Sequence, residues 1–361
     1  MTSEELFSIK IEEPDISVYN KAKENFDSLA KPLDGFGDLE DIACRIAAIQ
    51  DSEHPDISKR AAVVMFSDNG VVKSGVSQTD SSVTLDVARL FAKGLSTVGV
   101  ETAGFGIDMI GVDVGIDSDE RVPGIIDRKV AKGTKNIAEA AAMTEEECLA
   151  AIKAGMDTIR DCSDKGYSLI ATGEMGIGNT TTATALLCAL TGADPKEVTG
   201  RGAGLSDEGL KRKTDVIEKA LALHDLGGSD KITKAPDAFS ALCTVGGLDI
   251  AALSGTFIGG ALRHIPMIID GLIVAVAALT AALIVPGVEK YMIASHKGRE
   301  MGTEIALSRL GLKPVLDADM ALGEGTGAVM IIPVIEMVLN VYNRGTSFKT
   351  AQIQQYGRYD K

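Results

Sequence analysis

The sequence predicts an α/β protein built around a mostly parallel β-sheet that helices cover on both faces. From residue 167 onward, short apolar runs alternate with helical segments, the pattern of parallel strands joined by crossover helices. The chain also contains 39 glycines and no tryptophan, which fits a fold with many ligand-facing turns. A chain of 361 residues is longer than one ordinary hydrophobic core accommodates, so one large or two unequal domains are expected.

The N-terminal part of the chain predicts helices followed by two separated strands. Residues 1–60 mix polar and apolar residues in a helical pattern, which Gly35–Gly37 breaks into two helices. A capping box at Thr144–Glu147 predicts the start of a helix that runs to Asp161. The other elements expected before residue 167 are a strand over 61–66 that closes at Ser67–Gly70, a helix over 84–94, a strand over 107–114 and a charged surface excursion over 115–135.

The remaining chain supplies most of the predicted sheet. Strands are expected over 167–171, 266–269, 291–294 and 314–316, and helices over 180–191, 210–222 and 248–262. Ligands of such sheets bind beyond the carboxyl ends of the strands. We therefore expect one crevice to hold the polar residues that follow the strands: Asp68, Glu174, Asp270, Ser295, His296 and Glu324.

Composition narrows the class of partner. The formal net charge of −15 argues against a nucleic-acid binder, which needs a basic surface, so any phosphate site must be local. The five cysteines do not have the spacing of a metal-binding motif, so we expect reduced, mostly buried thiols in a cytoplasmic protein. The uncharged segment 271–285 is too short to span a membrane and predicts a buried core helix. The acidic N-terminus does not resemble a signal peptide.

The most informative stretch is Thr172–Ala185, which reads TGEMGIGNTTTATA. A strand enters it, a small-residue helix leaves it, and glycines and hydroxyl groups lie between. Glycine lets the backbone approach a ligand closely, and the first N–H groups of a helix favour an anion. The stretch lacks the lysine of a P-loop and the glycine order of a dinucleotide fingerprint. It predicts a phosphate site, with a plain strand–helix turn as the alternative.

A second loop, Leu322–Gly327, reads LGEGTG and places Glu324 between two glycines. A carboxylate in such a turn can approach a substrate closely. If it is partly desolvated, its pKa rises and it becomes a competent base near neutral pH. The alternative is a surface turn with an incidental glutamate.

A third glycine-rich turn, Gly200–Gly204, carries Arg201 and precedes the basic run Lys211–Lys213. In an acidic chain this local basic cluster suggests a second face of the phosphate site. The alternative is a solvated helix face that pairs with nearby acids. Asp270 and Ser295, each after a strand, could hydrogen-bond ribose hydroxyls or simply cap helices.

Together these motifs resemble the nicotinate-nucleotide:dimethylbenzimidazole phosphoribosyltransferases, including relatives that use phenolic acceptors. The matching stretches are GEMGIGNTTT (173–182), GRGAGLSDEGLKRK (200–213), 246–250, 269–271, IASH (293–296) and LGEGTGA (322–328). The resemblance implies a large α/β domain with a Rossmann-like sheet over about 61–330. It also implies a small helical domain from 1–60 and about 331–361, and a dimer, formed either by two copies or by two paralogues.

The same resemblance implies a reaction. Phosphoribose moves from nicotinate mononucleotide to a lower-ligand base of a cobamide, with inversion at C1′ and release of nicotinate, without a metal or other cofactor. Glu324 is implied as the general base, and Glu174 as a group that assists catalysis or holds the base site. The implied phosphate and nucleotide residues are Met175, Gly176, Gly178, Asn179, Thr180, Gly202, Ala203, Gly204, Lys213, Asp270 and Ser295.

The acceptor pocket is implied to contain Asp68, Asn69, Ser77, Gln78, Ser81 and Leu322. Here the chain departs from the family pattern, since Asn69 replaces a histidine and Ser81 stands where a glutamine is expected. These changes leave the acceptor open between a benzimidazole and a phenol or p-cresol. A further alternative is a non-catalytic paralogue that binds nucleotide or supports a partner's active site. The intact Glu324 and GEMGIGNTT loop favour catalysis.

Overall fold

A computed structural model describes residues 1–228 and 231–358. Its main element is a six-stranded sheet in the order β3-β2-β1-β4-β5-β6, in which every pair of neighbours is parallel. The strand order reverses between β1 and β4, so the carboxyl ends of these two strands frame a crevice. The strands are β1 (Arg60–Ser67), β2 (Ile107–Gly115), β3 (Ile125–Asp127), β4 (Leu169–Met175), β5 (Met267–Ile269) and β6 (Met292–Ala294).

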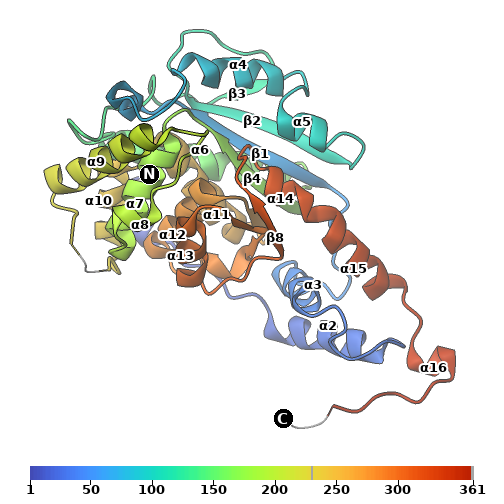
Figure 1. Ribbon diagram of the computed structural model, residues 1–361. Coiled ribbons are helices and arrows are strands. Elements are labelled where there is room, and N and C mark those ends of the chain that lie inside the picture. The colour runs from blue at the N-terminus through green and yellow to red at the C-terminus, as the bar shows by residue number, and fades with distance from the viewer. Residues whose placement is uncertain (229–230, 359–361) are drawn as a thin grey trace.

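Helices cover both faces of this sheet (Figure 1). Because β1 is buried on both faces, its alternate residues enter two cores: Val63 and Met65 on one side, Val64 and Phe66 on the other. The helices that contribute to the first core include α6 (Glu145–Asp164), α7 (Asn179–Thr191), α9 (Asp207–Leu223), α10 (Ala235–Val245), α11 (Leu248–Leu262), α12 (Leu272–Ile284) and α13 (Met301–Arg309).

The second core is built from the other face of the sheet and from helices at both ends of the chain. Phe26 and Tyr342 meet edge to face, with ring centroids 5.0 Å apart, which joins the N- and C-terminal segments. The helices of this core are α2 (Ile16–Ser28), α3 (Asp38–Ile49), α4 (Ser82–Phe91), α5 (Thr97–Glu101), α14 (Thr326–Met330) and α15 (Ile332–Arg344).

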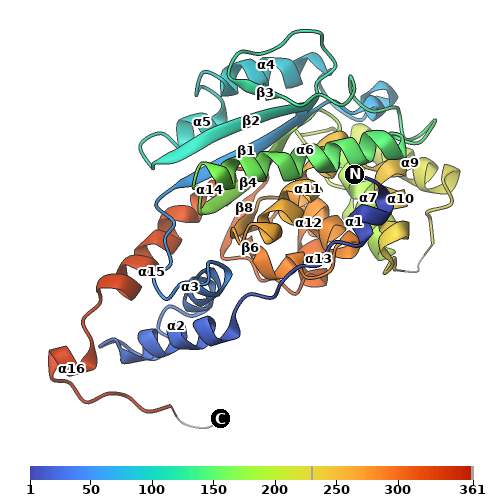
Figure 2. The same ribbon diagram turned by 180° about the vertical axis from the view of Figure 1, so that it is seen from behind.

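The terminal helices α2, α3 and α15 extend beyond the end of the sheet, where α16 (Phe348–Ala351) follows them (Figure 1). The first helix, α1 (Ser3–Phe7), lies apart from them beside α10, where Phe7 packs against Phe239 at 5.8 Å (Figure 2). The segment 1–60 therefore contacts both cores. The predicted division into two domains stays a prediction, and its last residues, 359–361, lie outside the described part of the chain.

The structure corrects two details of the sequence reading. The run at 314–316 enters β8 (Leu316–Met320), which pairs with β7 (His296–Gly298) in a separate two-stranded sheet. Its Asp317 and Asp319 are exposed, so it could not lie at the buried centre of the main sheet. The segment 115–135, expected to be a charged surface excursion, contains the short edge strand β3. The polar residues on both sides of β3 prevented its recognition in the sequence.

Three short helical segments complete the fold: η1 (Gly70–Ser74), α8 (Pro195–Val198) and η2 (Val288–Tyr291). The predicted core helix at 271–285 is α12, which is almost entirely buried. Another stretch, Thr326–Arg344, has the length and hydropathy of a membrane span. However, 56% of it is buried inside the structure, which is typical of a core helix.

Candidate functional site

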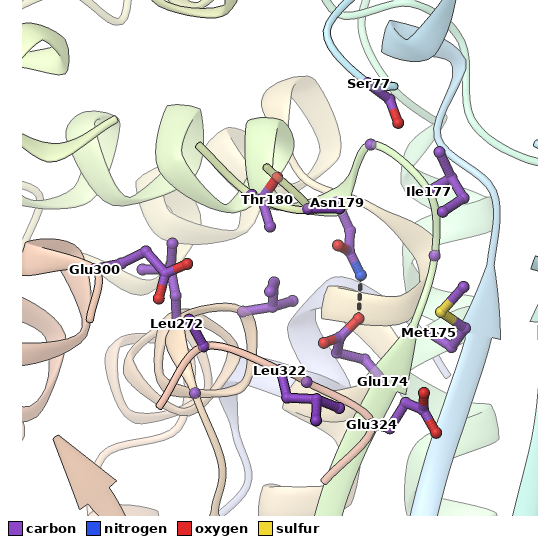
Figure 3. A pocket seen from close by; sticks show the side chains of 18 of the residues that line it. Ser77, Glu174, Met175, Ile177, Asn179, Thr180, Leu272, Glu300, Leu322 and Glu324 are labelled. Carbon is purple, nitrogen blue, oxygen red and sulfur yellow. Dashed lines mark hydrogen bonds between the residues drawn. The ribbon is translucent and has the colours of Figure 1, made fainter. Parts of the chain in front are cut away.

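A cavity of about 340 Å³ opens at the carboxyl edge of the main sheet, beyond β4, β5 and β6. Six stretches of chain line it, and Figure 3 shows the side chains that face it from several of them. They are Val76–Thr79 with Val83, Glu174–Thr180, Arg201–Ala203 with Leu205, Asp270–Ile273, His296 with Glu300, and Met320–Glu324.

Most residues that the sequence nominated line this cavity. They are Glu324, Glu174, Met175, Gly176, Gly178, Asn179, Thr180, Gly202, Ala203, Asp270, Ser77, Gln78 and Leu322. The lining does not include Gly204, Lys213, Ser295, Asp68, Asn69 or Ser81, which lie behind or beside it. The three glycine-rich loops, which come from distant parts of the sequence, thus meet at one place.

The GEMGIGN loop comprises the last three residues of β4, the turn 176–178 and the first residue of α7. Gly178 has a φ of +91° at the N-cap of α7, where no side-chain oxygen caps the helix. The first turn of α7 therefore faces the cavity with Asn179 and Thr180 in its lining. The N–H groups of Asn179 and Thr181 already donate to the carbonyls of Gly176 and Gly178, so the helix dipole is what favours a phosphate at this terminus.

The Gly200–Gly204 turn closes against the same helix end. A Cβ on Gly202 would lie 3.0 Å from the Thr180 hydroxyl oxygen and 3.5 Å from the Lys213 ammonium, so glycine permits this approach. Lys213 is 1% exposed, and its ammonium donates to Thr180 Oγ1 at 2.8 Å and to the Gly200 carbonyl at 3.0 Å. Burial lowers the pKa of Lys213 to about 8.

Glu174 projects from the end of β4 into a buried acidic environment. The side-chain amide of Asn179 donates to Glu174 Oε2 (Figure 3) and also to Asp249 Oδ2, the latter at 3.0 Å. Burial, followed by the charge of Asp249, raises the pKa of Glu174 to about 8. Burial also raises the pKa of Asp249 to about 6. Glu174 is therefore a neutral acid over much of the physiological pH range.

Glu324 occupies a strained turn between two glycines. Its φ is +59°, in the left-handed region, and Gly323 and Gly325 have φ values of +96° and +87°. This conformation is costly for a residue that carries a Cβ. The half-buried carboxylate accepts a 3.4 Å hydrogen bond from the Val98 N–H at the start of α5. Figure 3 shows that the carboxylates of Glu324 and Glu174 point in different directions.

Asp270 supports the Glu324 loop from the neighbouring strand end. Its Oδ2 accepts from the Gly325 N–H at 3.2 Å and its Oδ1 accepts from the Ala328 N–H at 3.1 Å. The ring of His296 lies 4.0 Å from Asp270 and shares a 2.8 Å hydrogen bond with Ser295 Oγ. At this strand end the cavity is therefore lined by His296, while Ser295 supports its ring.

The residues proposed for the acceptor side divide between cavity and core. Ser77 and Gln78 line the cavity, and the Gln78 side chain donates to the Gly204 carbonyl. Ser81 lies at the N-cap of α4 without a side-chain capping bond. The remaining acceptor-side residues, Asp68 and Asn69, lie in the core beneath the cavity.

Asp68 is buried and accepts from Thr84 Oγ1 at 2.6 Å and from the Asp117 N–H at 2.8 Å, and burial raises its pKa to about 6. Asn69 is 1% exposed, and its Oδ1 accepts from Thr182 Oγ1 at 3.3 Å. Both residues thus hold the strand-end loops together from below.

Sequence reasoning missed several residues at this site. Asp249 follows Gly246–Gly247 at the start of α11, and no local pattern distinguishes it from an ordinary helix residue. Glu300 enters the lining through the β7–β8 sheet, which the sequence did not predict. Glu101 lies on α5; burial, with Asp270 and Glu324 nearby, raises its pKa to about 7. In the part of the chain that the structure describes, no group of three or more His, Cys, Asp or Glu could hold a metal ion.

Comparisons with known proteins agree with this arrangement over nearly the whole chain. A family model described as phosphoribosyltransferase matches residues 11–353. The chain is 42% identical over 330 residues to the nicotinate-nucleotide--dimethylbenzimidazole phosphoribosyltransferase of Acetivibrio thermocellus, covering 91% of this chain and 92% of the relative. It is 40% identical over 343 residues to the protein of the same name from Clostridium perfringens, covering 95% and 93%.

A solved structure gives the same picture. The crystal structure of CobT from Thermus thermophilus superposes with a TM-score of 0.87 at 35% sequence identity. The match covers 94% of this chain and 100% of that chain.

Proposed function

The chain belongs to this phosphoribosyltransferase family, and we propose that it transfers phosphoribose from nicotinate mononucleotide to an aromatic base destined to be the lower ligand of a cobamide. It is a pentosyltransferase of the nicotinate-nucleotide--dimethylbenzimidazole type. The observation that carries the proposal is the cavity in which the GEMGIGN loop, the Gly200–Gly204 turn and Glu324 meet.

The proposed reaction requires a general base rather than a general acid. In nicotinate mononucleotide the pyridinium nitrogen leaves C1′ with the bonding electron pair and becomes neutral, so departure needs no proton. The acceptor forms the new bond to C1′ from the opposite face, which inverts the configuration, and must lose its N–H or O–H proton. We assign this proton to Glu324, whose half-buried carboxylate stands in the cavity lining.

The 5′-phosphate is proposed to bind at the first turn of α7. Support comes from the dipole of this helix end, the approach of Gly202 and the buried ammonium of Lys213 behind Thr180. The carboxylate of Glu324 in the cavity lining would also stabilise positive charge that develops on the ribose as the leaving group departs.

Glu174 is proposed to assist as a hydrogen-bond donor. Its raised pKa, about 8, leaves a proton on the carboxyl group near neutral pH. A neutral carboxylic acid in the lining can donate to an acceptor nitrogen or oxygen without repelling Glu324.

The identity of the acceptor depends on the segment Ser67–Ser82. A benzimidazole presents a second ring nitrogen that can accept a hydrogen bond, whereas a phenol or p-cresol presents only its hydroxyl group. Asn69 is buried below the cavity and Ser81 lies outside its lining, so the polar residues of this segment that we expect to face an acceptor are Ser77, Gln78 and Thr79. We propose a benzimidazole acceptor, with a phenol as the second candidate because Ser81 stands where a glutamine was expected.

We also propose that the protein acts as a dimer, of two copies or with a paralogue. Exposed apolar side chains on α5 and α15 support this proposal, because Val100 is 61% exposed and Met337 is 67% exposed. Light scattering of the purified chain, alone and with a paralogue, measures the mass and tests both forms.

A competition assay tests the proposed reaction. The protein is incubated with nicotinate mononucleotide and equal amounts of dimethylbenzimidazole, adenine and phenol, and the released nicotinate and each α-riboside 5′-phosphate are quantified. Acceptor-dependent nicotinate release, with one product dominant, is expected. No turnover with any of these acceptors would instead favour a non-catalytic subunit.

A further inference from the structure

Asp270 and the Glu324 loop are joined across two strand ends. Asp270 follows β5 directly and is 2% exposed. Its two carboxylate oxygens accept from Gly325 and Ala328, which are the N-cap and the third residue of α14. A carboxylate from another part of the chain therefore satisfies two of the N–H groups that a helix leaves unpaired at its start.

This pairing fixes the backbone on the C-terminal side of Glu324. The left-handed conformation of Glu324 is unfavourable by itself, so surrounding contacts must hold it. On the other side, the Thr326 hydroxyl donates to the Gly323 carbonyl at 2.9 Å. Asp270 and Thr326 thus restrain the peptides that flank Glu324.

His296 restrains the same helix end sterically. A Cβ on Gly327 would lie 2.0 Å from His296 Nδ1, so the ring packs directly on the α14 backbone. The ring also lies beside Asp270, at 4.0 Å from its Oδ1. Asp270, His296 and the N-terminus of α14 therefore form one buried contact, which has Glu324 at its cavity edge.

We propose that Asp270 is a positioning residue, whose carboxylate acts on Glu324 through Gly325 and Ala328 rather than on the ribose. Each of its oxygens already accepts a backbone N–H, so the substrate is not needed to satisfy this buried group. The inference rests on the proposed function, because it takes Glu324 as the base. It replaces the nucleotide-binding role that the sequence suggested for Asp270.

The first test is Asp270→Asn, which keeps the shape but leaves one acceptor oxygen for two N–H donors. We expect kcat to fall roughly tenfold to a hundredfold, the cost of misplacing a catalytic group by about an ångström. The Kd of nicotinate mononucleotide, measured by calorimetry, should change less than about twofold. A parallel rise in Kd would identify Asp270 as a substrate ligand and overturn the proposal.

Asp113→Asn is the matched control. Asp113 is a buried carboxylate near the end of β2 that lies outside the cavity lining. Its Oδ1 accepts from the Gly115 N–H at 3.0 Å and the Ile116 N–H at 2.9 Å, and its Oδ2 lies 3.2 Å from the Lys129 ammonium. Its variant should lose thermal stability, mainly through the ion pair with Lys129, and keep the wild-type kcat. If both variants lose kcat equally, lost stability alone explains the effect of Asp270→Asn, and the inference is contradicted.

A double-mutant cycle connects the effect to the base. In a Glu324→Gln background, Asp270→Asn should cause little further loss of kcat, because the group that it positions is already gone. If the two substitutions lower kcat by independent factors that multiply in the double variant, the proposal is contradicted. If Glu324→Gln alone keeps near-native turnover, the assigned base is wrong, which separates failure of the proposed function from failure of this inference.

The wild-type protein provides a test that does not depend on the folding of any variant. A crystal structure with nicotinate mononucleotide should show Asp270 still bonded to Gly325 and Ala328, with the ribose hydroxyls held elsewhere. A ribose hydroxyl within hydrogen-bond distance of the Asp270 carboxylate would overturn the proposal.

Discussion

Gly173 lies directly against the peptide that follows Glu324. A Cβ on Gly173 would be 2.6 Å from both the Glu324 carbonyl oxygen and the Gly325 nitrogen. The two most informative motifs of the sequence therefore pack backbone to backbone, with β4 supporting the loop that carries the proposed base. The first glycine of GEMGIGN serves this contact, whereas Gly178 serves the turn into α7.

Gly173→Ala should displace the Glu324 loop. The clash is with backbone atoms, which cannot move aside as a flexible side chain can, so we expect a loss of about 1–3 kcal/mol in unfolding free energy. We also expect a clear fall in kcat. Gly111→Ala in β2 is a control, because its Cβ would crowd Ile125 and Phe91 at 2.5 and 2.9 Å, away from the cavity. Equal kcat values for the two variants would refute the proposed support.

Glu174→Gln should change how stability depends on pH. Burial raises the pKa of Glu174 from 4.5 to about 8, so between these values the folded state binds more protons than the unfolded state. Glu174 therefore contributes stability that is present below pH 4.5 and lost as the pH rises toward about 8. The slope is at most about 1.4 kcal/mol per pH unit.

Urea unfolding of wild type and Glu174→Gln at several pH values across this range measures the effect. The difference in unfolding free energy should move in favour of the variant as the pH rises. A difference that stays constant with pH would show that the pKa of Glu174 is not raised in the folded protein.

Lys213→Met should weaken binding of nicotinate mononucleotide roughly tenfold, because it removes the charged donor that holds the Thr180 hydroxyl at the proposed phosphate site. A hydrogen bond to a charged group is worth about 1.5 kcal/mol or more. Because burial lowers the pKa of Lys213 to about 8, wild-type affinity should also fall as the pH rises through that value. Calorimetric titration measures both effects. Lys211→Met, on an exposed face of the same helix, should bind normally, and an equal loss there would indicate a nonspecific charge effect.

Much of the fold could be predicted because parallel strands have short apolar runs with clear boundaries. The cores of β1, β2, β5 and β6 lie where the sequence placed them, whereas β4 overlaps its predicted run only at 169–171 and continues to Met175. The exceptions were β3, β7 and β8, which are short, partly exposed and contain charged or polar residues. Their pairing depends on neighbouring loops rather than on their own hydrophobicity.

The site was predictable where glycine patterns mark a loop, as at Glu174 and Glu324. It was not predictable where a role depends on a partner distant in sequence. Asp249 becomes important only because Asn179 joins it to Glu174. Asp270 follows a strand, a pattern that predicts a ligand, but its bonds to the Gly325 and Ala328 N–H groups of α14 have no signal in the local sequence.

The central claim is that Glu324 removes the acceptor proton during phosphoribosyl transfer. The most direct test is the rate of nicotinate release from nicotinate mononucleotide, with and without dimethylbenzimidazole, for wild type and Glu324→Gln. Wild type should release nicotinate only with the acceptor, and Glu324→Gln should be roughly 10²–10⁴-fold slower with little change in nucleotide affinity. Near-native turnover of Glu324→Gln would contradict the account and make Glu174 the remaining candidate for the base.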